Sequence, residues 1–95
     1  MENSVIKITE YCSYYKIEPD FVISLEGVGL IETLIISGER FIHETQLKDL
    51  ERYVTWHYDM DINIEGIDAL RNMLSNLEQL QSEVMLLKEK LRVYE

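Results

Sequence analysis

The chain has 95 residues, a net charge of −9 and a single cysteine. Its length predicts one small domain, the lone cysteine excludes an internal disulfide, and no apolar run approaches the ~20 residues that span a membrane. Residues 1–68 hold fourteen acidic and five basic side chains, whereas residues 69–95 hold four of each, so the acidic part should repel polyanions such as DNA and attract a basic protein partner.

The first predicted element is a short helix in "ITEYCSYYKI". Its side chains Tyr11, Cys12 and Tyr15 fall at helical spacings, and Thr9 is the candidate capping residue.

A second helix is predicted in "EPDFVISLEGVG". Pro19 suits the first helical position, where its missing N–H group loses no hydrogen bond, and Gly27 and Gly29 should end the helix. Only Ile17 and Glu18 separate the two helices, a spacing that is typical of a helix-turn-helix.

A β-hairpin and a third helix come next. The β-prone runs "TLII" and "RFIH" flank Ser37-Gly38, a dipeptide that favours a tight hairpin turn. The following "ETQLKDLERYVTWHY" carries Leu47, Leu50 and Val54 at helical spacing, which predicts a long helix.

The acidic stretch "DMDINIEGIDAL" resembles a calcium loop, because oxygen-bearing side chains alternate at Asp59, Asp61 and Asn63. A calcium helix-loop-helix also needs glycine at the sixth loop position and a bidentate glutamate at the twelfth. Those positions hold Ile64 and Leu70, so we predict no metal site here.

The same stretch predicts the start of a fourth helix, over residues 64–94. Asn63 is a good N-cap, and Ile62 and Ile67 occupy the two ends of a hydrophobic staple. The capping box is incomplete, because Gly66 stands where its glutamate would be.

The fourth helix carries an unbroken heptad repeat of apolar residues. Its a and d positions are Leu70, Met73, Leu77, Leu80, Val84, Leu87, Leu91 and Tyr94. This seam predicts a left-handed coiled coil in a homodimer, because so small a domain cannot easily bury so long a helix against itself. The alternative is that the seam packs on the third helix. Attractive pairs of Glu83 with Lys88 or Lys90 can be drawn for parallel and for antiparallel dimers, so both orientations stay open.

The candidate catalytic side chains form no recognisable set. His57 is close to Asp59 and Asp61 in the sequence, but a histidine at a helix end more often caps carbonyl groups. Cys12 has no close basic neighbour and suits a small core position. We therefore predict no enzyme, no cofactor and no metal. The N-terminus has no secretion signal, so we expect a cytoplasmic protein.

The order helix, turn, helix, hairpin, helix, long helix resembles the MerR-type winged helix-turn-helix. "ITEYCSYYKIEPDFVISLEGVGLIE" resembles the opening of that family, and "INIEGIDALRNML" resembles the step into its dimerisation helix. The resemblance implies a mostly α fold with a small β-hairpin, in which a winged helix-turn-helix-like domain over residues 1–60 precedes a long coiled-coil dimerisation helix over residues 61–95.

The charges depart from that pattern. MerR-type activators place basic residues on the second helix and the wing, but here the second helix has no Arg or Lys and the wing has Arg40 alone. Phosphate contact needs several positive groups, so this surface disfavours DNA. Acidic residues stand there instead and are our predicted partner-binding residues: Asp20, Glu26, Glu32 and Glu39.

A closer resemblance is to the CbpM-type chaperone modulators, which are small MerR-like proteins without a separate effector domain. The stretches "EYC", "GLIE", "FIHETQLKDLER" and "HYDMDINIEGIDAL" carry it. It implies a protein that binds the J-domain of a DnaJ-like co-chaperone and restrains that co-chaperone. The basic helix of a J-domain would complement an acidic helix-turn-helix face. The alternative function is a MerR-like DNA-binding transcriptional regulator.

Overall fold

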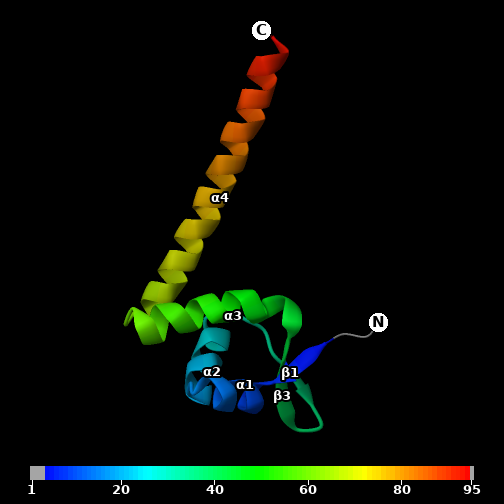
Figure 1. Ribbon diagram of the computed structural model, residues 1–95, viewed down its shortest axis with the longest axis vertical. Helices are drawn as coiled ribbons and strands as arrows, with labels where there is room; N and C mark the ends of the chain where they lie inside the picture. Colours follow the sequence, from blue (N-terminus) through cyan, green and yellow to red (C-terminus); the bar gives the residue numbers. More distant parts are fainter. Residues whose placement is uncertain (1–3, 95) are drawn as a thin grey trace.

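Figure 1 shows the computed structural model of the chain, which describes residues 4–94. The elements in chain order are β1 (Val5–Lys7), α1 (Ile8–Tyr15), α2 (Pro19–Gly27), β2 (Leu34–Ile36), β3 (Glu39–His43), the 3-10 turn η1 (Glu44–Gln46), α3 (Leu47–Val54), the π-helical turn η2 (Thr55–Asp59) and α4 (Ile64–Val93). The elements up to η2 form a compact head, and α4 projects from it, so that the molecule measures 60 × 38 × 21 Å. Among the described residues, no helix is both long enough and apolar enough to cross a membrane.

The predicted hairpin is confirmed. Strands β2 and β3 pair antiparallel, with Ile36 opposite Glu39 across a two-residue turn. Ser37 and Gly38 both have positive φ angles, 53° and 81°. This is the turn conformation whose twist matches that of the flanking strands.

The hairpin is only part of the sheet, so the prediction of a small β-hairpin was incomplete. Strand β1 pairs antiparallel with β3, and the sheet order is β1-β3-β2. Ile6 of β1 lies opposite the fully buried Ile42 of β3. A three-residue strand is too short to show an alternating pattern, which is why the sequence did not reveal it.

The helix-turn-helix is present, but the predicted cap of its first helix is wrong. Helix α1 begins at Ile8, and the capping position is Lys7, whose side chain makes no capping hydrogen bond. Thr9 therefore lies inside the first turn. Strand β1 leads directly into α1, so the chain direction at this end is set by the sheet. Helix α2 has Pro19 in its first turn and ends at Gly27, as predicted.

The third predicted helix is confirmed, but it is not uniform. It opens with the 3-10 turn η1, continues as α3 and widens into the π-helical turn η2. Leu50 and Tyr53 on α3 are fully buried, and the Tyr53 hydroxyl accepts a hydrogen bond from Arg71 of α4 at 3.2 Å. This bond joins the head to the long helix.

The predicted cap of the long helix is confirmed. The Asn63 side chain accepts a hydrogen bond from the Gly66 amide at 2.8 Å, and Ile62 and Ile67 both pack in the core. The structure also explains the incomplete capping box. A Cβ atom at Gly66 would lie 2.7 Å from the Ile62 side chain, so a glutamate there would have to displace the isoleucine that forms one end of the hydrophobic staple.

We expect Asn63→Ala to lower the free energy of unfolding by about 1 kcal/mol, because the Gly66 amide loses its acceptor at the helix start. Asn76→Ala on the same helix is the matched control, since Asn76 is exposed in the helix interior and alanine favours helix there. Urea unfolding followed by circular dichroism measures both variants. An equal loss for the two would contradict the cap.

The core lies between the helix-turn-helix, the sheet, α3 and the first turn of α4. Its buried side chains are Ile8, Tyr11, Cys12, Ile17, Phe21, Val22, Leu25, Ile31, Ile42, Leu50, Tyr53 and Ile67. The prediction that Cys12 is a core residue is confirmed, and burial raises the pKa of its thiol. That change keeps the thiol protonated and unreactive.

Candidate functional site

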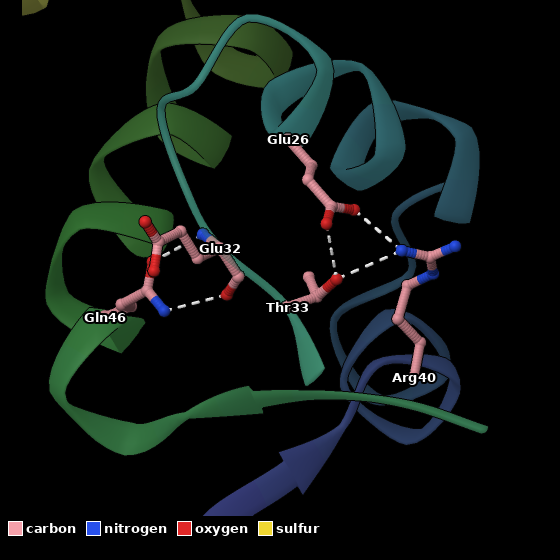
Figure 2. Close-up of polar contacts among 5 residues, drawn as sticks. All are labelled: Glu26, Glu32, Thr33, Arg40 and Gln46. Atoms are coloured by element: carbon pink, nitrogen blue, oxygen red, sulfur yellow. Dashed lines mark hydrogen bonds and ion pairs between the residues drawn. The ribbon is translucent and has the colours of Figure 1, made fainter. Parts of the chain in front are cut away.

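Two of the predicted partner-binding carboxylates take part in polar contacts within the head. Glu26, in the last turn of α2, pairs with Arg40 of β3 at 2.8 Å and accepts a hydrogen bond from the Thr33 hydroxyl at 2.7 Å. Arg40 also donates to the Thr33 hydroxyl oxygen at 3.0 Å, which closes a triangle of contacts (Figure 2). This triangle fixes the wing against α2 and uses the one arginine of the wing.

Glu39 is paired in a similar way. Its carboxylate lies 2.7 Å from the Lys7 ammonium group on the neighbouring strand β1. The hydrogen bond and the charge of Glu39 raise the pKa of Lys7. The contact is solvent-exposed, so it contributes little to stability, but it balances part of the acidic charge of the wing.

Glu32 is held by its backbone. The Gln46 side chain accepts from the Glu32 amide and donates to the Glu32 carbonyl oxygen, each at 2.8 Å (Figure 2). This double contact anchors the segment between α2 and β2 on η1. The Glu32 residue is exposed, as is Asp20 in the first turn of α2. These two carboxylates are the members of the acidic set for which the described residues supply no ion pair.

The two histidines of the chain have structural contacts. His57 donates from Nδ1 to the carbonyl oxygen of Ile62 at 2.8 Å and stacks on Phe21 with ring centres 4.4 Å apart. The interpretation of His57 as a group that caps a carbonyl is therefore confirmed. His43 accepts from the Thr45 amide at 3.1 Å and so caps η1.

The acidic stretch before α4 forms a turn in which Asp61 has a φ of 62°. Within residues 4–94, no group of three or more His, Cys, Asp or Glu side chains is placed to hold a metal ion. The Asn63 side chain of this stretch caps α4 through its contact with the Gly66 amide.

The heptad seam of α4 is exposed along most of its length. Leu70 is partly buried at the head, and the later a and d side chains of the single chain are exposed: Met73, Leu77, Leu80, Val84, Leu87, Leu91 and Tyr94. Figure 1 shows α4 leading away from α3. The alternative that the seam packs on the third helix is therefore wrong, because the helix diverges from α3 after its first turns.

A comparison with protein families agrees with this arrangement. The sequence model of the family described as MerR HTH family regulatory protein matches residues 6–89. The chain belongs to this family. Searches of curated proteins and of solved structures found no match.

The MerR-family match covers nearly all of the head and most of α4, so the prediction of a MerR-like helix-turn-helix is confirmed. Within that fold, the second helix of the helix-turn-helix carries Asp20 and Glu26 and no Lys or Arg. Arg40 of the wing is engaged by Glu26. This MerR-family surface thus presents little positive charge for phosphate groups.

Sequence reasoning missed the polar side chains that hold the acidic residues in place. Thr33, Gln46 and Lys7 each come from an element other than that of the carboxylate or backbone group they contact. They lie between 7 and 32 residues from those partners along the chain, and the two members of each pair stand on different segments, so no periodicity within one helix or strand connects them. The one available signal was the opposite charge of Lys7 and Glu39 on neighbouring strands.

Proposed function

We propose that this MerR-family protein is a chaperone modulator, which binds the J-domain of a DnaJ-like co-chaperone and restrains its action on the partner ATPase. The observation that carries the proposal is the charge of the helix-turn-helix. Helix α2 has no basic residue, and the only arginine of the wing is bound to Glu26. A basic helix complements such a surface, and the resemblance to the CbpM-type modulators supports the same partner.

The contacts of the acidic residues suggest different tasks for them. Glu26 forms an ion pair with Arg40, and Glu39 forms one with Lys7, so these two carboxylates hold the wing in place. Asp20 and Glu32 are exposed, so their charges face solvent and are available to a partner. We infer that Asp20 and Glu32 contribute most to the attraction and that Glu26 and Glu39 set the shape of the surface.

The test measures association of the purified protein with the J-domain of its own cell's DnaJ-like co-chaperone. We expect Asp20→Lys together with Glu32→Lys to slow association at low salt by about tenfold, with little change at high salt, because long-range attraction sets the rate and salt screens it. Glu26 and Glu39 stay unchanged, since lysine there would place a second cation beside Arg40 or Lys7. Stopped-flow fluorescence gives the rate constants.

The matched control is Glu78→Lys together with Glu89→Lys, two exposed residues of α4 that give the same change in net charge. Equal slowing by both pairs would mean that net charge alone acts and that the helix-turn-helix face is not the site. Absence of J-domain binding by the wild type at low salt would refute the proposal. The ATPase rate of the partner chaperone, stimulated by the J-domain, is measured with and without the protein. A lower rate with the protein indicates restraint, and an unchanged rate indicates binding without restraint.

The alternative, a MerR-like DNA-binding regulator, rests on the family itself. It predicts binding of duplex DNA by the wild type with a steep dependence on salt. Binding measurements on the wild-type protein, with duplex DNA and with the J-domain, decide between the two functions. A wild type that binds DNA and does not bind the J-domain would favour the regulator.

A further inference from the structure

A pocket with aromatic walls lies between α1, β1 and α3. Its volume is about 210 Å³, and three tyrosines of α1 line it: Tyr11, Tyr14 and Tyr15. Ile6 of β1 and Leu47 of α3 complete its apolar lining. The pocket is therefore built by three elements of the head and not by one loop.

The tyrosine rings are arranged as an open cluster. The Tyr11 and Tyr15 ring centres lie 4.6 Å apart, and Tyr15 meets Tyr14 edge to face at 4.8 Å. Tyr11 is buried at the base, whereas Tyr14 is 78% and Tyr15 49% exposed. Tyrosines at this exposure present ring faces to an incoming group at small cost in side-chain entropy.

The charged residues of the lining are both acidic. Glu10 of α1 and Glu51 of α3 line the pocket, and no basic side chain of the described residues does so. Burial, followed by the charge of Glu51, raises the pKa of Tyr11 to about 12, so the Glu51 carboxylate acts on the pocket base. Lys7 is a nearby cation whose pKa is raised first by its contact with Glu39 and also by the charge of Glu10, but its ammonium group pairs with Glu39 at 2.7 Å.

We propose that this pocket binds the guanidinium group of an arginine side chain on a basic partner segment. A guanidinium lies flat on aromatic faces and donates to carboxylates, and it is less strongly hydrated than the ammonium group of lysine. The pocket provides tyrosine faces for stacking, two carboxylates to accept hydrogen bonds, and an apolar lining that a weakly hydrated cation can enter. An uncharged side chain would leave the carboxylates without a partner. The proposal does not depend on the J-domain being the partner.

The test uses a probe with one arginine, acetyl-Ala-Ala-Arg-Ala-Ala-amide, titrated into the full chain labelled with ¹⁵N. We expect amide shifts confined to Glu10–Tyr15 and to α3 around Glu51, with a Kd on the order of millimolar. The same peptide with citrulline, which is isosteric and neutral, should not bind. The lysine peptide should bind more weakly than the arginine peptide.

Two pairs of variants separate the contribution of the aromatic ring to peptide binding from that of the carboxylate charge. Tyr14→Phe keeps an aromatic face and should bind like the wild type, whereas Tyr14→Leu should weaken binding by roughly two- to fivefold. Glu51→Gln should weaken it by a similar factor, and Glu89→Gln on α4, with the same change in charge, should not. Tyr14 and Glu51 are exposed, so neither substitution should unfold the head.

The proposal is overturned by any of three results: citrulline binding as well as arginine, shifts spread over the wing or α4, or equal effects of Glu51→Gln and Glu89→Gln. Lysine binding as tightly as arginine would overturn the preference for guanidinium. If the wild type binds the arginine peptide at this pocket but does not bind the J-domain, this proposal stands and the result counts against the proposed function alone.

Discussion

Leu77→Glu together with Val84→Glu is expected to convert a dimer of this protein into monomers. The two residues occupy successive a positions of the heptad, and in the single chain they are 50% and 49% exposed. A homodimer through α4 is our proposal for what covers this apolar face. The glutamates would place unpaired charges in the seam of both chains, and burying such groups without partners costs several kcal/mol.

We expect the dimer dissociation constant to rise at least about a thousandfold, which corresponds to about 4 kcal/mol. Sedimentation equilibrium over a range of concentrations measures it. The control is Ser75→Glu with Ser82→Glu, which adds the same charges seven residues apart at f positions on the opposite side of α4. The control should stay dimeric. A seam variant that is still dimeric at native stability would remove the seam from the interface.

The parts of the fold that were predicted from the sequence are those with local signals. Helix α4 and the start at Asn63 were predicted because the heptad period and the cap are local signals. The hairpin was predicted because Ser37-Gly38 fits one turn type. These elements depend on residues close together in the chain.

The elements that were missed depend on the rest of the fold. Strand β1 has three residues and forms only because β3 offers an edge for it. Thr9 could cap a helix in isolation, but the sheet starts α1 at Ile8 instead. No periodic pattern in the sequence marks the π-helical turn η2 at the end of the third helix. In this turn His57 stacks on Phe21 and donates a hydrogen bond to the Ile62 carbonyl oxygen.

The candidate site was predictable in composition but not in its contacts. The absence of basic residues on α2 is a sequence property, and so is the presence of Asp20, Glu26, Glu32 and Glu39. Which of these carboxylates are paired depends on the three-dimensional arrangement. The pairing of Glu26 with Arg40 joins residues 14 apart in the chain, so it follows only once the wing is placed against α2.

The second large effect is expected at Ile67, which attaches α4 to the head. Its side chain is 0% exposed and belongs to the core cluster that includes Leu50 and Tyr53. Ile67→Ala should lower the free energy of unfolding by about 2–5 kcal/mol, because it removes buried methyl groups and leaves a cavity. This is a large part of the 5–15 kcal/mol that is typical of a domain.

Ile35→Ala is the matched control, since it makes the same substitution at an exposed position of β2. We expect it to cost less than about 1 kcal/mol, mainly through the lower strand preference of alanine. Urea unfolding at one fixed protein concentration compares the two variants, because the proposed dimerisation would make the midpoint depend on concentration. If Ile67→Ala unfolds at the same urea concentration as Ile35→Ala, then α4 is not anchored by the core. The long helix would in that case be held to the head mainly by the hydrogen bond between Arg71 and Tyr53.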